Sequence, residues 1–521
     1  MVFSKNAKSI PSSKRSLRPW VFWPPFFVCI WGVFYSLIDV ESMVEQATWL
    51  NTKVLNVLGP VYSLAVLLFL LICIVVYWSP LGRVRIGGSS AKPLLSKWRW
   101  YTITLTTTLA VGILMWGSAE PLYHLHSPAK ALNIQPNSPA AVDFSLGTMF
   151  LHWSFLPYAI YTVAAVMFAL MYYNRKQPFR LGSLFYPLFG FNATKRWSKS
   201  IDALCLFCLV AGMAASLGSG ILGLEAGLKY MFTLGGTWEL KLFITLGIVA
   251  AFVLSAITGL LKGIRLLAAF NIILFFALWL FLLCNVPLQK TFDMMVGGLQ
   301  DFAIHLDDVS LYSLKYNDTW AHEWTMMYWA NWLAWTPITA LFLGRLCLGY
   351  TVRQVILINL VLPSITVILW LSVLSSTSIQ LDQAMNGDIF SMIEASGNPG
   401  DALFSIFDGL PLATITGIIL LLTAFLSYVT AADSNTSAMS GLCSNGISPE
   451  SPEPKLWLKV VWGVLVGTVA LTLLVFSSID GIRIMSNIGG IPALFICLLV
   501  VGGLIKLLFN PNAAKFDEQV N

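Results

Sequence analysis

Long apolar runs separated by short polar connections dominate the chain. Each run has about 20 or more mostly apolar residues, the length that an α-helix needs to cross the hydrocarbon core of a bilayer. Twelve such runs lie near residues 20–38, 60–79, 101–124, 144–173, 200–233, 238–259, 264–286, 324–348, 355–378, 411–434, 457–478 and 483–509. The pattern predicts an all-α integral membrane protein with twelve transmembrane helices.

The composition agrees with this prediction. The 521 residues are 57% hydrophobic and 11% charged, whereas soluble domains have roughly 45–50% apolar and about 25% charged residues. The net charge of +6 comes from basic residues that are scattered singly, so we expect no nucleic-acid partner. The eight cysteines lie in or beside apolar stretches, where they are expected to pack as small apolar side chains.

The basic residues also predict the orientation in the membrane. In the twelve-span arrangement, most of the 31 Lys and Arg residues fall in the two tails and the even-numbered loops, whereas the segment 379–411 has acidic residues and no Lys or Arg. Positively charged loops stay in the cytoplasm. We therefore expect a multi-pass protein of the plasma (cell inner) membrane whose tails, 1–19 and 510–521, are both cytoplasmic. The first apolar run has no clear cleavage site and is expected to be retained.

The segment between the seventh and eighth spans, about 287–323, is too polar to cross a membrane. It carries apolar residues at helical spacing, including Leu288, Met295 and Phe302. We expect it to lie along the outer membrane surface as an amphipathic segment.

Three spans are interrupted by small or polar residues, which marks places where protein or water replaces lipid. The third span contains Gly112 and Glu120. The fifth reads as a small-residue face over 212–220, which indicates either a functional site or close helix packing. The tenth ends in a hydroxyl-rich stretch, 430–437, with Asp433 as either an intramembrane functional acid or a cap of the following turn.

The eighth span carries a stripe of tryptophans. Trp329, Trp332 and Trp335 stand at i, i+3 and i+6, so their indoles follow one side of the helix. An interfacial aromatic belt explains most tryptophans of membrane proteins and suits Trp20 and Trp98. Trp335 lies about twelve residues into its span, close to the midplane at about 1.5 Å per residue, where a belt residue is not expected.

A second aromatic set occupies neighbouring helical positions in the fourth span: Trp153, Tyr158 and Tyr161. We expect no fixed anion beside rings at this depth. Such rings suit a quaternary ammonium, which has no proton to donate but is attracted to each aromatic face by about 0.5–2 kcal/mol. The residues alone therefore favour an aromatic cage for an onium group over a lipid-facing belt.

The same residues carry a family resemblance. The tryptophan-rich stretch 329–337 is followed by Gly344-Arg345 and by Thr351-Val352-Arg353, and other motifs lie at Trp116–Pro121, His152-Trp153, Leu260–Gly263 and Thr430–Ser434. With these motifs the chain resembles the betaine/carnitine/choline transporter family over essentially its whole length.

The resemblance implies a sodium-symporter-like fold. In this fold two inverted five-helix repeats, here about 101–286 and 324–509 within a transporter domain of 20–509, enclose the substrate near the midplane. It also implies a homotrimer and transport of a trimethylammonium compound. The substrate-binding residues that it implies are Met115, Trp116, Trp153, Tyr158, Tyr161, Trp329, Asn331, Trp332 and Trp335.

The chain departs from the family pattern at several of these positions. Asn331 stands where most members have a tryptophan, which favours a smaller, more polar or sulfonium ligand. Ala431 replaces a hydroxyl beside Thr430, so a sodium site at Thr430 and the backbone of Leu109 has lost a ligand. Asn271 stands where some sodium-independent members have an arginine. Sodium coupling, proton coupling and exchange therefore all stay open, with these positions as candidates for cation coupling: Leu109, Gly112, Ser216, Asn271, Thr430 and Asp433.

The sequence thus predicts a secondary active transporter that imports an onium zwitterion or cation such as glycine betaine, choline, carnitine or dimethylsulfoniopropionate. No cofactor is expected besides a coupling sodium ion or proton. The alternatives are an exchanger of the same family and, less favoured, a channel or a membrane enzyme. A metal-dependent enzyme needs clustered ligands, whereas His124, His126, His305 and His322 are expected outside the spans or at outer helix ends, and His152 is expected to pack or to form hydrogen bonds.

Overall fold

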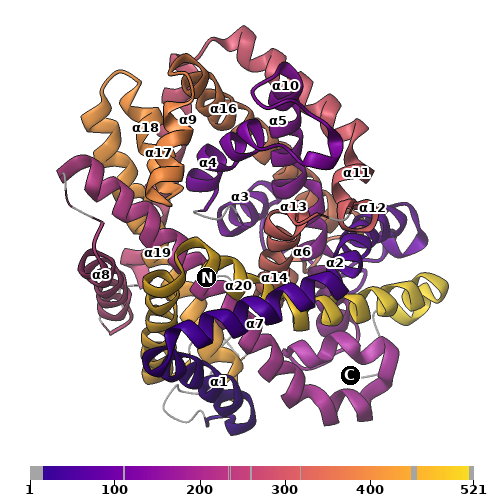
Figure 1. Ribbon diagram of the computed structural model, residues 1–521. Helices are drawn as coiled ribbons and strands as arrows, with labels where there is room; N and C mark the ends of the chain where they lie inside the picture. Colours follow the sequence, from indigo (N-terminus) through magenta and orange to yellow (C-terminus); the bar gives the residue numbers. More distant parts are fainter. Residues whose placement is uncertain are drawn as a thin grey trace.

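The computed structural model describes residues 16–108, 112–232, 234, 236–257, 261–316, 318–447 and 454–515. These residues form helices and connecting turns, with two isolated β-bridges, Leu17 with Ser444 and Arg85 with Thr351, in place of any sheet. Figure 1 shows α6 and α14 in the middle of the body, with α8 and α11 at its edges. The all-α prediction is confirmed for the described residues.

The first part of the chain forms nine α-helices within the described residues: α1 (Pro19–Ile38), α2 (Val40–Trp78), α3 (Lys97–Thr108), α4 (Gly112–His126), α5 (Pro139–Trp153), α6 (Phe155–Ala169), α7 (Tyr186–Phe232), α8 (Trp238–Ile257) and α9 (Leu261–Asn285). Capping residues in the sequence set where several of these helices begin. Asp39 caps α2 by accepting from the Ser42 amide at 3.0 Å, and Ser138 followed by Pro139 begins α5.

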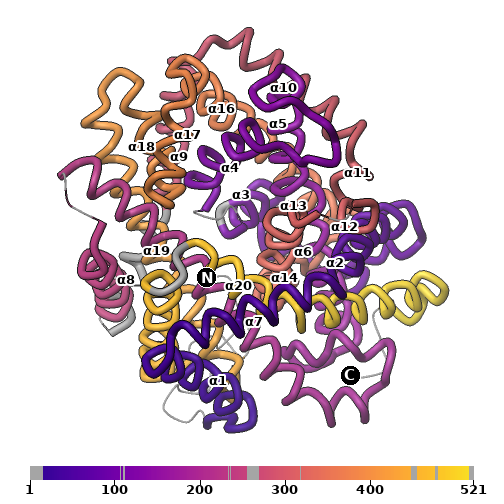
Figure 2. The backbone as a smooth tube through the Cα atoms, in the orientation of Figure 1, coloured from indigo at the N-terminus to yellow at the C-terminus, as the bar shows by residue number. Residues whose placement is uncertain are grey.

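The second part continues with α10 (Leu288–Ile304), α11 (Leu306–Ser310), α12 (Tyr312–Lys315), α13 (Trp320–Glu323), α14 (Thr325–Leu346), α15 (Val352–Ile356), α16 (Leu362–Ala384), α17 (Asp388–Ser396), α18 (Gly400–Asp408), α19 (Ala413–Leu442) and α20 (Leu456–Phe509). A capping box between Thr351 and Gln354 begins α15. In Figure 2, α1 and α20 come from opposite ends of the chain, yet both pack against α7.

Eight helical segments among the described residues are long and apolar enough to cross a membrane, or nine if the bent pair of α9 and α10 is counted as one span. They are Pro19–Ile38, Val40–Trp78, Pro139–Asn174, Leu181–Phe232, Val352–Ala384, Ala413–Leu442, Leu456–Val475 and Ile479–Phe509. The remaining predicted spans fall on α3 with α4, on α8, on α9 and on α14, which are also helical. A multi-pass membrane protein is the architecture that follows.

Two predicted elements differ from the expectation: the fourth span has an internal break, and the amphipathic segment 287–323 packs against protein. The fourth span is divided between α5 and α6 at Ser154, whose φ of −113° and ψ of −114° are not helical. The chain bends by 108° between α9 and α10, and α10 then packs along α5, with Asp301 lying over Gly147. Part of the amphipathic segment 287–323 therefore packs against α5, which is a protein surface.

The small-residue face of α7 allows three neighbouring helices to approach closely. A Cβ atom on Gly212 would lie 3.1 Å from the Cβ of Ala334 on α14, and one on Gly220 would overlap the Tyr428 ring of α19. One on Gly218 would lie 3.0 Å from Ile482 of α20. These contacts support close helix packing, one of the two interpretations of this stretch.

The centre of the molecule is formed by helices that are buried on all sides. Every residue from Leu156 to Ala169 of α6 is buried, as is every residue from Ile113 to Leu122 of α4. A helix that is apolar all round belongs in the interior of a bundle. These two helices, together with α5 and α14, carry the aromatic residues that were predicted to bind the substrate.

Candidate functional site

A cavity of about 770 Å³ runs between the central helices. Six of the aromatic residues that line it lie on α4, α5, α6 and α14 and are called the aromatic wall here: Trp116, Trp153, Tyr161, Tyr328, Trp332 and Trp335. All but Trp335 are no more than 6% exposed. The cavity is large enough for a small organic molecule and lies in the range typical of ligand pockets.

Trp332 stands at the centre of this wall. Its ring centroid lies 5.9 Å from that of Trp153, with an interplanar angle of 82°, and 5.2 Å from that of Tyr161, with an angle of 62°. Such edge-to-face contacts are preferred geometries for aromatic pairs. The indole Nε1 donates a hydrogen bond of 3.1 Å to the carbonyl oxygen of His152, which fixes the orientation of the ring.

Three residues predicted to bind ligand do not line the cavity. Six residues separate Trp329 from Trp335, so on an α-helix the two side chains point about 120° apart. Trp329 is fully buried, and its ring lies 5.8 Å from the His152 ring. Tyr158 lies behind Trp332, 6.0 Å from its ring. Met115 is 3% exposed and is also absent from the lining. These three residues lie outside the lining of the cavity, and their direct contact with a ligand stays a prediction.

The polar residues predicted for the site are distributed around the same cavity. Asn331 lines it with a buried side-chain oxygen, Oδ1, that has no hydrogen-bond partner. Gly112 and Ser216 line it as well. The Asn271 amide donates to Ser427 Oγ at 2.5 Å, and the Thr430 hydroxyl donates to the Ser427 carbonyl oxygen at 3.0 Å. Leu109 lies outside the described residues.

Asp433 also lines the cavity, but its charge is compensated. The Lys459 Nζ of α20 lies 2.7 Å from Asp433 Oδ1 on α19, and the two side chains are 13% and 10% exposed. The carboxylate therefore pairs with a neighbouring helix, an arrangement that neither interpretation of Asp433 from the sequence included.

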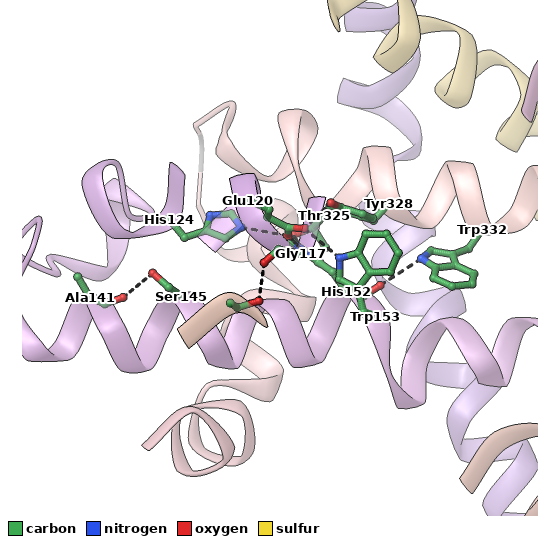
Figure 3. A network of polar contacts seen from close by, with 11 residues as sticks. Gly117, Glu120, His124, Ala141, Ser145, His152, Trp153, Thr325, Tyr328 and Trp332 are labelled. Atoms are coloured by element: carbon green, nitrogen blue, oxygen red, sulfur yellow. Dashed lines mark hydrogen bonds and ion pairs between the residues drawn. The ribbon is translucent and has the colours of Figure 1, made fainter. Parts of the chain in front are cut away.

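Behind the aromatic wall lies a buried carboxylate, shown in Figure 3. Glu120 of α4 has no exposed surface. Its Oε2 accepts hydrogen bonds from Trp153 Nε1 at 2.9 Å and from the Tyr328 hydroxyl. Its Oε1 lies 2.7 Å from His152 Nδ1 and 3.2 Å from His124 Nε2. The expectation of rings with no fixed anion beside them was therefore wrong.

The histidines of this cluster bear on two expectations. His124 lies in the last turn of α4, at a helix end, but it is completely buried, and its Nδ1 has no hydrogen-bond partner. The prediction for His152 is confirmed, since it bonds Glu120 through Nδ1 and the Thr325 hydroxyl through Nε2 at 3.1 Å. The ligand-type atoms of Glu120, His124 and His152 lie within 4.8 Å of one another, and their contacts are those of a hydrogen-bond cluster.

At the opposite end, the cavity is bounded by charged residues. Arg18 and Asp202 form a buried ion pair of 2.5 Å, and both line the cavity. A second guanidinium bond, from Arg18 Nη1 to the carbonyl oxygen of Leu442 at 2.7 Å, ties the segment before α1 to the end of α19. The cavity thus extends from the aromatic wall towards the place where these two chain segments meet.

Comparison with known proteins gives the family. The profile of the betaine/carnitine/choline family transporters (BCCT) matches residues 20–513. The chain is 27% identical over 509 residues to the glycine betaine transporter OpuD of Bacillus subtilis, covering 96% of this chain and 97% of the relative. It is 28% identical over 492 residues to the ectoine/hydroxyectoine transporter of Virgibacillus pantothenticus, covering 93% and 96%.

A third relative is named for a different substrate. The osmo-independent choline transporter BetT1 of Acinetobacter baylyi is 27% identical over 497 residues, which are 94% of this chain and 93% of the relative. These relatives are transporters and not enzymes, and the apolar helices agree with a multi-pass membrane protein. Both the profile match and the relatives extend over nearly the whole chain, and the protein is therefore a member of the betaine/carnitine/choline transporter family.

Proposed function

We propose that the protein is a secondary active transporter that imports a small onium compound by alternating access. The substrate is a quaternary ammonium or sulfonium zwitterion or cation of the size of glycine betaine, choline, carnitine or dimethylsulfoniopropionate. The observation that carries this proposal is the set of aromatic faces around Trp332 on one side of a 770 Å³ cavity. Relatives that transport glycine betaine and choline support the same substrate class.

The chemistry of the wall favours an onium group over a primary amine. A primary ammonium has three protons that require acceptors, whereas a methylated ammonium or sulfonium presents only a spread positive charge. Trp153, Tyr161 and Trp332 offer aromatic faces, and two of their polar groups, the Trp153 and Trp332 indole nitrogens, are already engaged with protein acceptors. The two indole nitrogens are therefore not available to a ligand, and Asn331, which also lines the cavity, offers a free acceptor, its Oδ1.

The proposed coupling ion is sodium or a proton. Thr430 lines the cavity and its hydroxyl donates to the Ser427 carbonyl oxygen, while Ala431 supplies no second hydroxyl. Asn271 brings an amide in the region where a guanidinium would replace the ion in sodium-independent members, and its Oδ1 has no partner. A substrate/product exchanger is the second proposed mode, because the incomplete hydroxyl set is compatible with transport that needs no ion.

The proposed architecture has twelve spans, with repeats over about 101–286 and 324–509. It is supported by α4 and α14, which both contribute to the aromatic wall and belong to the first spans of the two proposed repeats. We further propose a homotrimer in the plasma (cell inner) membrane with both termini in the cytoplasm. The bias of Lys and Arg towards the even-numbered loops supports this orientation.

Reconstituted uptake tests the proposal. Purified protein in proteoliposomes is supplied with labelled glycine betaine, choline, carnitine or dimethylsulfoniopropionate under an imposed sodium gradient, an imposed proton gradient, or internal unlabelled solute. We expect gradient-driven accumulation of at least one onium compound and none of its primary-amine analogue. Transport of the primary amine at an equal rate, or of none of the onium compounds, would contradict the proposal.

A further inference from the structure

The Glu120 cluster contains a carboxylate and no fixed positive charge among its partners. Two of the four groups that contact the carboxylate, the Trp153 indole and the Tyr328 hydroxyl, are neutral donors, and the other two are imidazoles. An unpaired charge without contact to water is strongly disfavoured inside a protein. The protonation of the cluster therefore decides whether it carries an uncompensated charge.

The charged groups on neighbouring elements have other partners. Arg483 of α20 lines the cavity, lies over the Trp324 ring, 5.3 Å from its centroid, and pairs with Asp480 at 3.3 Å. Asp382 of α16 pairs with His126 at 2.6 Å. From α18, Asp401 lies 3.5 Å from Lys229 of α7, and from α17, Glu394 lies near Tyr123 and is exposed.

The remaining elements around the cluster contribute neutral groups. On α16, Ser375 and Ser378 donate to the carbonyl oxygens of Gly117 and Ser118 of α4. The aromatic Trp320 of α13 lies against the His124 ring at 5.4 Å. No fixed cation among these described residues contacts Glu120, so direct compensation comes from an added proton or from a cation bound in the cavity.

Counting protons gives the two states of the cluster. With Glu120 ionised and both imidazoles neutral, all four neighbours can donate and the cluster has a net charge of −1. One proton lies between Glu120 Oε1 and His152 Nδ1, which are 2.7 Å apart, in both states. An added proton goes to His152 Nε2 and makes the cluster neutral. The Thr325 hydroxyl can accept from or donate to His152 Nε2 at 3.1 Å, so His152 keeps its second hydrogen bond in either state.

The same carboxylate is linked directly to the cage. Trp153 and Tyr328 both line the cavity, their ring centroids are 5.3 Å apart, and both donate to Glu120 Oε2. A cation held against these rings is separated from the carboxylate by the ring itself, a distance of about 8 Å. Two unit charges about 8 Å apart, at an effective dielectric constant of about 20, change each other's binding by roughly thirtyfold.

We propose that Glu120 and His152 share one exchangeable proton, and that an onium head group bound against Trp153 and Tyr328 displaces it. This rests on the proposed function, because it needs the onium group in that cavity. Linkage is reciprocal, so the affinity for the onium rises with pH until the cluster is fully deprotonated. A proton that leaves on binding is not carried with the substrate, so this linkage is separate from the choice of coupling ion.

Equilibrium binding to the full-length protein in detergent tests the proposal. Titration calorimetry with choline and with glycine betaine is carried out in two buffers of equal pH and different ionisation enthalpy, between about pH 5.5 and 8.5. For the wild type we expect release of up to about one proton per bound choline, and an affinity that rises up to roughly thirtyfold with pH. This measurement needs no variant.

Two variants and one matched control locate the proton. Glu120→Gln should bind choline as weakly as the wild type at low pH, with no proton release and no pH dependence, and His152→Gln should reduce the release. Glu394→Gln removes an exposed carboxylate of α17 by the same chemical change and should keep the wild-type release and pH profile.

The outcomes separate the two proposals. Choline binding by the wild type that is independent of pH and of buffer would overturn the proton linkage and leave the proposed function standing. A pH dependence that persists in Glu120→Gln, or that disappears from the wild type when a metal chelator is added, would also overturn it. Failure of the wild type to bind any onium compound would reject the proposed function itself.

Discussion

Replacement of Trp332 by leucine should weaken onium binding by about thirtyfold while the protein still folds. The ring has three aromatic neighbours within 6.0 Å of its centroid, and it is one wall of the cavity. A desolvated cation–aromatic contact contributes up to about 2 kcal/mol, and each 1.4 kcal/mol is a factor of about ten in the dissociation constant. Leucine keeps an apolar surface but has no ring quadrupole.

Two further substitutions measure separately what the hydrogen bond of Trp332 and what another tryptophan of α14 contribute to binding. Trp332→Phe keeps an aromatic face and loses only the 3.1 Å bond to the His152 carbonyl oxygen, a change of about 1 kcal/mol or roughly fivefold. Trp329→Leu removes a tryptophan that does not line the cavity. It should lower stability, as large-to-small core changes do, but leave the dissociation constant of folded protein within about twofold.

The assay is equilibrium binding of labelled glycine betaine or choline to purified protein, normalised to the folded fraction measured by size-exclusion chromatography. The expected order of affinity is wild type and Trp329→Leu, then Trp332→Phe, then Trp332→Leu. An unchanged dissociation constant in Trp332→Leu would refute the cage. An equal loss in Trp329→Leu would refute the distinction between lining and buried tryptophans that the structure draws.

Three other predictions follow from named contacts. Asn331→Trp should restore a ring at the cavity wall and shift selectivity towards bulkier betaines, as read from a competition panel; an unchanged order of competitors contradicts it. Gly220→Ala places a methyl group on the Tyr428 ring and should lower the thermal unfolding temperature, whereas Gly32→Ala, with nothing within 4 Å, should not. Lys459→Met should destabilise by about 3 kcal/mol or more by leaving Asp433 unpaired, and adding Asp433→Asn should recover most of the loss in a thermal-shift assay.

The aromatic wall could be predicted from the sequence to a large extent. Trp153, Tyr161, Trp332 and Trp335 line one cavity although they come from distant parts of the chain. Their spacing places each on one side of a helix, and the family motifs indicate which helices meet. The resemblance supplied the pairing of helices, because periodicity describes a single helix and not its neighbour.

The limits of sequence reasoning appear at residues whose partners are remote. Glu120 stands in a recognisable motif, but its hydrogen bonds come from Trp153 and Tyr328, which are 33 and 208 residues away along the chain. The partner of Asp433 is likewise 26 residues away on another helix. Such pairings depend on tertiary packing, which no local pattern of apolar and polar residues encodes.

Backbone breaks were also difficult to predict. The non-helical residue that separates α5 from α6 is Ser154, with no glycine or proline at that position. Pro157 follows inside the first turn of α6, where its missing amide proton is tolerated. The break was therefore invisible to a search for long apolar runs, although it sets where Trp153 ends α5 and how its indole reaches Glu120.

The central claim is that the cavity recognises positive charge on a methylated head group through aromatic faces. Its most direct test is competition by choline and by 3,3-dimethyl-1-butanol, which has the same shape with a neutral carbon in place of the nitrogen. With labelled glycine betaine bound to the wild-type protein, choline should compete at least about a hundredfold better, because two or more rings each contribute up to about 2 kcal/mol to the cation alone. Equal competition by the neutral analogue would show that shape and apolar contact suffice, and would contradict the account.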